Sequence, residues 1–280
     1  MTGPYWMKTL INKTFSGRFF LSELTRYPRV GRVVDKLLFE GDEIFYLPKD
    51  RVIPIGEAVD PAEVRSTAVP SAVLEHFIRE ADFHWIMDFC ICRNSAGCTD
   101  YPTHLGCLFL GEAARGINPK FGRAVGAHEV LEHVARCREA GLVHLVGRNK
   151  LDTVWLNIGP SEQLLTICNC CPCCCLWKVL PTIDPLISGK VTRMPGVRVF
   201  VTDKCVGCGT CTRGACFVSA IRLEGKQAVI DDDLCRGCGR CADVCPNGSI
   251  RVDIDRPDYI EAVIERIAGV VDVTGRGDGA

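Results

Sequence analysis

Residues 205–216 of this chain read CVGCGTCTRGAC, and residues 235–246 read CRGCGRCADVCP. Both stretches carry three cysteines separated by gaps of two residues, and a fourth cysteine follows a few residues later. In such a loop each turn points its sulfur inward, so that three thiolates surround one corner of a cubane cluster. The fourth ligand of that cluster must come from elsewhere in the chain. The repeat therefore predicts two metal–sulfur sites near the C-terminal end of the sequence.

The repeat resembles the bacterial-type ferredoxins with two [4Fe–4S] clusters, in which each half lends one ligand to the cluster of the other half. The resemblance covers roughly residues 198–255 and includes the eight cysteines, the paired glycines of both loops and the ending at residues 245–250. It implies two ligand sets, which are Cys205, Cys208, Cys211 and Cys245 for the first cluster, and Cys235, Cys238, Cys241 and Cys216 for the second.

Two features depart from the family pattern. Four residues rather than three separate Cys211 from Cys216, and Phe217 stands where the pattern usually has proline. We therefore expect a bulged loop near Cys216 and altered hydrogen bonds to its sulfur, which tune the reduction potential. Zinc is the alternative occupant of these sites. It is less favoured because structural zinc sites usually use separated Cys-x2-Cys pairs, without a third cysteine at the next two-residue gap.

Residues 221–230 separate the two loops and read IRLEGKQAVI, which predicts two short strands around a Glu-Gly-Lys turn. A segment of about sixty residues buries only a small apolar core. Assembly of the clusters should then supply much of its folding free energy. We expect this segment to be largely unfolded without iron.

The composition of the whole chain indicates what kind of protein it is. The chain has 280 residues, 47% of them hydrophobic and 24% charged, with a formal net charge of −1, which is typical of a soluble globular protein without a nucleic-acid partner. Lys8, Lys13 and Arg18 interrupt the N-terminal apolar residues, so no signal peptide is visible, and no apolar run is long enough for a transmembrane segment. The 19 cysteines therefore indicate metal-bound thiolates in a reducing cytoplasm, and so many oxidisable thiols favour anaerobic metabolism.

Hydrophobic periodicity predicts a mixed α/β cysteine-rich domain, and the resemblance of the repeat implies a small ferredoxin-like domain with two clusters after it, which together make an α+β fold. The expected helices are residues 71–85, 127–140 and 176–180, and the expected strands are residues 43–47 and 51–55, forming a hairpin, and 142–146, 153–158 and 164–167. Residues 181–196 are rich in proline and glycine and predict a linker.

We expect four segments along the chain. They are an N-terminal helical and hairpin segment (residues 1–60), a cysteine-rich domain (61–190), a ferredoxin domain with two [4Fe–4S] clusters (191–258), and a C-terminal helix with a disordered tail (259–280).

Ten cysteines upstream of the repeat form a second candidate site. One buried cysteine, such as Cys107 beside an apolar run, is an ordinary core residue, and Cys137 on the helix at residues 127–140 is read in the same way. Packing does not explain six cysteines within residues 168–175, because alanine or valine would pack as well in those positions. The candidate ligands of an additional metal are Cys90, Cys92, Cys98, Cys107, Cys168, Cys170, Cys171, Cys173, Cys174 and Cys175.

The upstream segment also resembles an uncharacterised domain that stands beside ferredoxin modules in iron–sulfur proteins of anaerobic bacteria and archaea. The shared elements are residues 90–93, 106–111, 141–144 and 168–171, in that order. The resemblance implies a common site and names no reaction.

The spacing of the upstream cysteines suggests how that site is assembled. Cys90 and Cys92 at a helix end are expected to meet cysteines among residues 170–174 at a strand end, with Arg93 offsetting their negative charge. A third iron–sulfur cluster is the first candidate occupant, zinc is the second, and a reactive dithiol among Cys173, Cys174 and Cys175 is the third. His104, three residues before Cys107, is the histidine whose spacing most resembles a ligand pair.

These patterns predict an iron–sulfur electron-transfer protein that passes electrons through two clusters to a partner redox enzyme, and they assign no catalytic residue. The alternative is a reductase in which these clusters feed an upstream metal site or dithiol, and a metal-storage or metal-sensing module is the third reading. The first forty residues carry seven Lys or Arg against three acids, so docking to a partner or peripheral contact with a membrane stays open.

Overall fold

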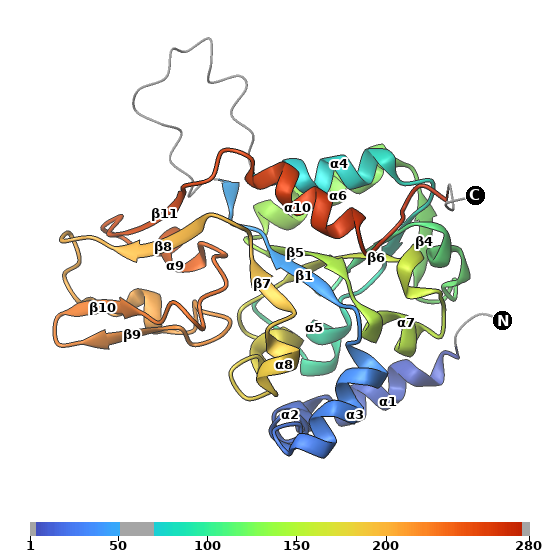
Figure 1. Ribbon diagram of the computed structural model, residues 1–280, viewed down its shortest axis with the longest axis horizontal. Helices are drawn as coiled ribbons and strands as arrows, with labels where there is room; N and C mark the ends of the chain where they lie inside the picture. The colour runs from blue at the N-terminus through green and yellow to red at the C-terminus, as the bar shows by residue number, and fades with distance from the viewer. Residues whose placement is uncertain (1–3, 51–69, 276–280) are drawn as a thin grey trace, which may run out of the picture.

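The computed structural model describes residues 4–50 and 70–275. A large body contains a mixed seven-stranded sheet with helices on both faces, and a small lobe with two two-stranded sheets lies at one end (Figure 1). The lobe spans residues 197–258 and carries the cysteine repeat. The expected α+β class, with a small C-terminal domain beside a mixed α/β domain, is confirmed.

The body sheet is built from β1 (Glu43–Tyr46), β2 (His84–Met87), β3 (Leu108–Leu110), β4 (Gly122–Val125), β5 (Val143–Arg148), β6 (Leu165–Cys170) and β7 (Val191–Arg193). Their order across the sheet is β4-β2-β3-β6-β5-β1-β7. Neighbouring strands are antiparallel except for β1 and β7, which are parallel.

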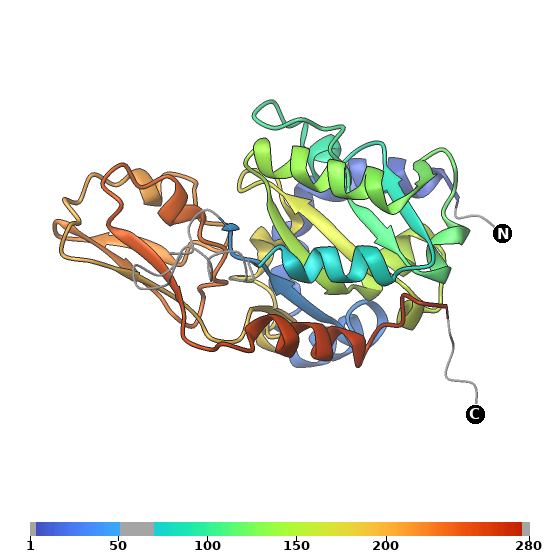
Figure 2. The same ribbon diagram turned by 90° about the horizontal axis from the view of Figure 1, so that it is seen from above.

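Helices cover the sheet in two layers. The layer drawn above the sheet in Figure 1 and nearest the viewer in Figure 2 contains α4 (Ala72–Glu80), α6 (Ala127–Glu139) and α10 (Tyr259–Ala268). The opposite layer contains α1 (Trp6–Thr14), α2 (Arg18–Leu24), α3 (Pro28–Leu38), α5 (Ile91–Ala96), α7 (Lys150–Leu156) and α8 (Pro185–Ser188). Short 3-10 turns join these elements, namely η1 (Phe15–Gly17), η4 (Glu112–Gly116), η5 (Ser161–Gln163), η6 (Leu176–Val179) and η7 (Thr210–Thr212).

The alternation of side chains along β6 decides which face of the sheet receives the cysteines. Leu165 and Ile167 are buried in the core beneath α4, α6 and α10. Successive strand residues point to opposite faces, so Cys168 and Cys170 face the layer of α1, α2 and α3. The strand therefore places thiols inside the body rather than on its surface.

The lobe consists of two short antiparallel pairs, one α-helical turn and the 3-10 turn η7. β8 (Val197–Val201) pairs with β11 (Ile250–Ile254), and β9 (Ile221–Glu224) pairs with β10 (Gln227–Ile230). The hairpin expected at residues 221–230 is therefore confirmed. The α-helical turn is α9 (Arg240–Asp243), and after β11 the chain returns to the body as α10 (Figure 2).

Three expectations about local structure are wrong. The helix expected to reach residue 85 ends at Glu80, and Trp85 is a buried residue of β2. The strand expected at residues 153–158 is mostly helix α7, because side chains hold its first turn: Asn149 and Trp155 both donate to Asp152. The expected linker at residues 181–196 contains α8 and β7, and β7 joins the body sheet. Residues 51–55 and 276–280 lie outside the described residues.

Candidate iron–sulfur and thiol sites

The first four repeat cysteines, called the first lobe quartet, are Cys205, Cys208, Cys211 and Cys245. Burial raises the pKa of the Cys211 thiol, and negative charge on Cys245, Cys205 and Cys208 raises it further, which shows that these four side chains are electrostatic neighbours. The N–H of Ala228 donates to Cys205 Sγ at 3.4 Å, and the N–H of Ser249 donates to Cys245 Sγ at 3.4 Å. Backbone amides directed at sulfur are the donors that stabilise a charged thiolate site.

The other four, called the second lobe quartet, are Cys216, Cys235, Cys238 and Cys241. Burial raises the pKa of the Cys241 thiol, and Cys238, Cys235 and Cys216 raise it further. The N–H of Ala220 donates to Cys216 Sγ at 3.3 Å, and the N–H of Gly237 donates to Cys235 Sγ at 3.5 Å. Each quartet thus combines three cysteines of one repeat with the last cysteine of the other.

The loop that departs from the family pattern is accommodated without separating its cysteines. Gly214, with φ of 72°, lies between Cys211 and Cys216 and takes a left-handed conformation that favours glycine. Phe217 is 2% exposed and packs edge-on against Tyr46 of β1, with ring centroids 5.6 Å apart. The residue that replaces the usual proline therefore joins the lobe to the body.

A different arrangement occurs upstream, where Cys98, Cys171, Cys173 and Cys174 form a compact quartet. Their sulfur atoms all lie within 4.8 Å of one another, and the Sγ of Cys173 is 3.6 Å from that of Cys98 and 3.4 Å from that of Cys171. Four thiolates around one zinc ion, at a Zn–S distance of about 2.3 Å, lie about 3.8 Å apart. The compact quartet therefore fits a single tetrahedral ion.

The distances between sulfur atoms also distinguish the lobe quartets from a site for one zinc ion. Among the described residues, the compact quartet alone has three or more Cys, His, Asp or Glu ligand atoms within 4.8 Å of one another. No three of the lobe thiols lie within 4.8 Å of one another, which suits ligands at the outer corners of a cubane rather than ligands of one ion. The residues present therefore fit the [4Fe–4S] cluster that the repeat predicts.

The other six candidate cysteines upstream of the repeat line one cavity of about 400 Å³, together with Cys171 of the compact quartet. Cys107 and Cys168 approach with their sulfur atoms 3.9 Å apart. Side-chain contacts also join Cys90 to Cys92 and Cys107, and join Cys170 to Cys168 and Cys175. We call this set the thiol ring, and its members are Cys90, Cys92, Cys107, Cys168, Cys170 and Cys175.

Arg93 lies between the thiol ring and the compact quartet. Its side chain is fully buried, and Nη1 donates to the backbone carbonyl of Asn169 at 2.7 Å while Nη2 donates to that of Leu105. Burial alone would lower the pKa of Arg93, but the neighbouring thiols, Cys90 and Cys171 first among them, hold it above its usual value. The expectation that Arg93 offsets thiolate charge agrees with this position.

The structure divides the upstream cysteines differently from the expected grouping. Cys90 and Cys92 share one cavity with Cys170 and Cys171, as expected, and also with Cys175, whereas Cys173 and Cys174 lie in the compact quartet. Period-two alternation along β6 could have shown that Cys168 and Cys170 share a face. Cys137 is fully buried outside both groups, and burial raises its pKa to about 12. His104 is exposed and is not among the residues of either group.

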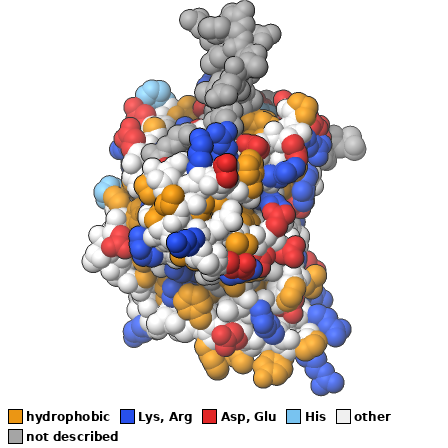
Figure 3. Space-filling model, turned by 90° about the vertical axis from the view of Figure 1, so that its left-hand side faces the viewer, with side chains coloured by type: hydrophobic (Ala, Val, Ile, Leu, Met, Phe, Trp, Pro, Cys, Tyr) orange, Lys and Arg blue, Asp and Glu red, His pale blue; other side chains and the backbone are white. Residues whose placement is uncertain are grey.

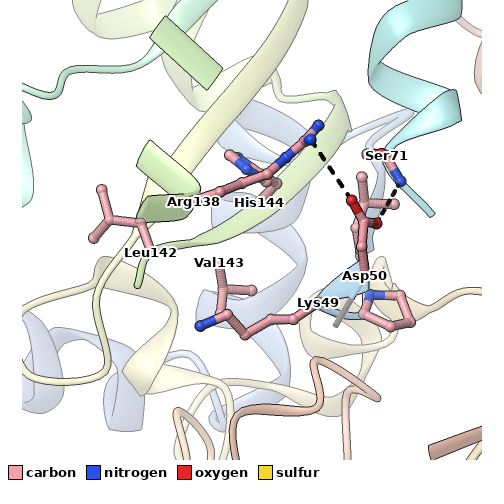
Figure 4. Close-up of a pocket in the computed structure, with 9 residues that line it drawn as sticks. Lys49, Asp50, Ser71, Arg138, Leu142, Val143 and His144 are labelled. Carbon is pink, nitrogen blue, oxygen red and sulfur yellow. Dashed lines mark hydrogen bonds and ion pairs between the residues drawn. The ribbon is translucent and has the colours of Figure 1, made fainter. Parts of the chain in front are cut away.

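A polar contact fixes the lobe against the body beside the second lobe quartet. Lys49, three residues after the end of β1, forms an ion pair with Asp243 of α9 at 2.8 Å, and both side chains are less than 10% exposed. The N–H of Lys49 donates to the carbonyl of Cys238 at 3.3 Å. Figure 4 shows the small cavity here, where Asp50 accepts from the N–H of Ser71 and pairs with Arg138 at 3.6 Å.

Tyr46 occupies the space between the thiol ring and the second lobe quartet, and sequence reasoning did not single it out. The side chain is fully buried, and among the described residues its hydroxyl has no hydrogen-bond partner. Burial raises the pKa of Tyr46, and charge on Cys175, Cys170 and Cys238 raises it further. Its hydroxyl therefore lies near sulfur atoms of both sites.

The outer surface of α2 and α3 is apolar and basic. Phe20, Tyr27 and Leu37 are each more than 60% exposed. In Figure 3, hydrophobic and Lys or Arg side chains gather at the lower end of the molecule, where Figure 1 places these helices. No helix within residues 4–50 and 70–275 has the length and apolar character needed to cross a membrane.

Comparison with known proteins identifies the second repeat. Residues 228–251 match the 4Fe-4S binding domain family, and this stretch contains Cys235, Cys238, Cys241 and Cys245. The chain is 28% identical over 96 residues to an uncharacterized ferredoxin of Methanocaldococcus jannaschii, a match that covers 30% of this chain and 58% of the relative. No solved structure matches this chain. The C-terminal region therefore carries a 4Fe-4S ferredoxin-type domain, which implies iron–sulfur electron transfer.

Proposed function

We propose that this chain relays electrons through two [4Fe–4S] clusters in its lobe to a partner redox protein. The observation that carries the proposal is that backbone amides donate to sulfur in both halves of the repeat, at Cys205 and Cys216 and at Cys235 and Cys245. The 4Fe-4S match at residues 228–251 supports the same conclusion for the second repeat. Each cluster, when bound, would accept and release one electron at a time.

The proposed ligands are the members of the two lobe quartets. Cys205, Cys208, Cys211 and Cys245 would hold the first cluster, and Cys216, Cys235, Cys238 and Cys241 would hold the second. The amides of Ala228, Ser249, Ala220 and Gly237 donate to these sulfur atoms and would disperse the negative charge of a reduced cluster.

The upstream cysteines favour a second candidate function, a reductase fed by the lobe. The observation in its favour is the thiol-lined cavity of the body, whose remaining walls are largely apolar side chains of α1, α2 and α3. An apolar pocket with a few convergent reactive groups is a common form of substrate site. The compact quartet would then have a structural role, because a single ion held by four thiolates has no open position for substrate.

The partners and the compartment belong to the proposal as well. A ferredoxin-type domain implies redox partners, and we place the docking face for a protein partner on the exposed apolar side of α2 and α3. A chain with 19 cysteines carries many oxidisable thiols, so we propose a reducing, cytoplasmic environment and anaerobic metabolism.

The test exploits the exchange of ligands between the repeats. In anaerobically purified full-length protein, Cys245→Ser should deplete the cluster of the first repeat, and Cys216→Ser should deplete that of the second, each with a loss of up to about four irons. Cys137→Ala is the matched control, because this buried cysteine belongs to neither quartet. Electron paramagnetic resonance of the reduced protein should show two interacting clusters in the control and one in each variant. If both lobe variants kept the iron content of the control, the proposal would be wrong.

A further inference from the structure

We propose that the thiol ring holds a third iron–sulfur centre, bound by all six of its cysteines and separate from the metal of the compact quartet. The inference rests on the proposed function, because the lobe clusters would exchange electrons with this centre.

The six thiols form one continuous set around one cavity. Contacts run from Cys92 to Cys90, then to Cys107, Cys168 and Cys170, and on to Cys175. Cys175 and Cys92 are electrostatic neighbours, which closes the ring. All six side chains also line the same cavity of about 400 Å³. A set of this kind is one site rather than several independent core cysteines.

The spacing within the ring excludes a single ion as its occupant. The sulfur atoms of one ring pair, Cys107 and Cys168, are 3.9 Å apart. Yet no three of the six sulfur atoms lie within 4.8 Å of one another, in contrast to the compact quartet. One tetrahedral ion needs its ligands at about 3.8 Å from each other. The ring instead suits thiolates placed around the outside of a larger inorganic core.

The number of thiols and their negative charge favour a centre larger than a [4Fe–4S] cluster. A [4Fe–4S] cluster uses four cysteine ligands, whereas six ring cysteines line this cavity, together with Cys171 of the compact quartet. Six buried thiolates are strongly unfavourable unless positive charge compensates them. Arg93 contributes one such charge from its buried position. A centre with more than four irons would supply the remaining positive charge and would bind all six ring thiolates.

Tyr46 supplies an independent observation that points to an occupant. Its buried hydroxyl, without a partner among the described residues, has Cys170 and Cys175 of the ring as neighbours, as well as Cys238 of the second lobe quartet. A buried hydroxyl without a partner costs free energy, so this group is expected to donate to a sulfur of an occupied centre. Cys168, Cys170 and Cys175 of the ring share one hydrophobic core with Phe217 and with three cysteines of the second lobe quartet, which are Cys216, Cys235 and Cys238. This contact places the second lobe quartet beside the ring, so that a cluster held there would be the one to exchange electrons with the ring centre.

The N-terminal helices provide the covering that such a centre needs. Met7, Ile11, Phe15, Val34 and Leu38 close the cavity over the thiols with apolar side chains. Excluding water protects a cluster from hydrolysis and lets the protein set its reduction potential. The first forty residues therefore serve as a cover for the ring.

Acid-labile sulfide tests the proposal, because a single ion in the compact quartet brings no sulfide. We expect more than about twelve sulfides per chain in anaerobic full-length protein, of which about eight belong to the lobe. The double variant Cys107→Ser/Cys168→Ser should lose more than about four sulfides and an equal or larger number of irons. The double variant Cys98→Ser/Cys173→Ser should lose one metal ion and no sulfide, and Cys137→Ala should lose neither.

Several outcomes would contradict the inference. About eight sulfides in the unaltered protein would leave no cluster in the ring, and a loss of four or fewer from the ring variant would mean an ordinary cubane with two spare thiols. If the ring variant fails to fold, Mössbauer spectroscopy of the unaltered protein decides, since a third centre must add iron sites beyond those of the lobe clusters. The proposed function is tested by different variants, Cys245→Ser and Cys216→Ser in the lobe, so its failure can be told apart from the failure of this inference.

Discussion

At the scale of single residues, glycines decide how closely backbone can approach the lobe thiols. Gly207 and Gly237 both have φ of 68°, a left-handed conformation that side chains rarely adopt. A Cβ on Gly207 would lie 2.6 Å from the carbonyl oxygen of Lys226, so close packing as well as conformation requires glycine there. The cysteines set the chemistry of the loop, and these glycines allow its shape.

Replacing Gly207 with alanine should therefore damage the first lobe quartet. Gly225→Ala is the matched control, because Gly225 has φ of 61° in the same lobe and nothing within 4 Å of its Cβ position. Both changes carry the conformational cost of about 1–2 kcal/mol, but Gly207→Ala adds a collision with backbone. We expect Gly207→Ala to lose iron and to bleach at lower urea concentration than Gly225→Ala. Equal iron content and equal urea midpoints would contradict this account.

Asp42 makes the stability of the body depend on pH. Burial raises the pKa of Asp42 to about 7 from its ordinary 3.8, while its Oδ1 accepts from the N–H of Lys150 at 2.7 Å. Between pH 4 and pH 7 the folded state holds a proton that the unfolded state has released. Stability from this group is therefore greatest below pH 4 and declines as pH rises to about 7.

Between pH 5 and pH 8, the variant Asp42→Asn should lose less stability than the unaltered protein. The two losses in free energy of unfolding should differ by about 1–3 kcal/mol. Urea unfolding followed by tryptophan fluorescence reports the body, because all four tryptophans lie outside the lobe. Asp88→Asn is the control, since that carboxylate is 59% exposed. A pH profile for Asp42→Asn that parallels the control would show that Asp42 is already ionised at pH 5.

At the scale of elements, hydrophobic pattern predicts the strongly periodic pieces and fails where tertiary contacts override propensity. α6 and the β9–β10 hairpin follow their patterns closely. Residues 153–158 contain Val154 and Trp155, which favour strands, yet buried side-chain hydrogen bonds to Asp152 stabilise α7 instead. Residues 191–193 are too short to predict as a strand, and pairing with β1 makes them one.

The small size of the lobe sheets leads to a prediction about iron removal. Two-stranded sheets are marginal by themselves, whereas the body sheet has seven strands and helices on both faces. After chelation of iron, amides of β9 and β10 should lose nearly all protection from hydrogen exchange, and those of β5 should keep most of theirs. Exchange measured by mass spectrometry before and after chelation tests this. Retained protection in β9 and β10 would mean that the lobe folds without its clusters.

At the scale of the whole molecule, the lobe is held in one orientation on the body. The buried pair Lys49–Asp243 and the hydrogen bonds from Arg240 to Gly141 and Tyr101 cross between the two parts. Phe217 and Tyr46 add an aromatic contact. These contacts lie beside the second lobe quartet, so they would keep its distance to the thiol ring constant.

A double-mutant cycle can measure the ionic part of this contact. Lys49→Met and Asp243→Asn, singly and together, should show a coupling of about 1–3 kcal/mol in the urea midpoint for bleaching of the clusters. Removing one partner leaves a buried charge, although Arg240 at 3.4 Å still faces Asp243. The exposed pair Arg198–Asp255 is the control and should show no measurable coupling. Additive effects at Lys49 and Asp243 would mean that the ion pair does not join lobe to body.

The sequence by itself determined the chemistry of the lobe, because cysteines at two-residue gaps with glycines between them specify a cluster loop through local geometry alone. It also indicated that the upstream cysteines bind metal together. Only the tertiary structure decided which of these cysteines belong to the compact quartet and which to the thiol ring. The compact quartet brings together Cys98 and the loop after β6, while the ring takes Cys168 and Cys170 from one face of that strand. Such contacts join residues more than sixty positions apart, and their pairing depends on sheet order and strand register, which no local spacing encodes.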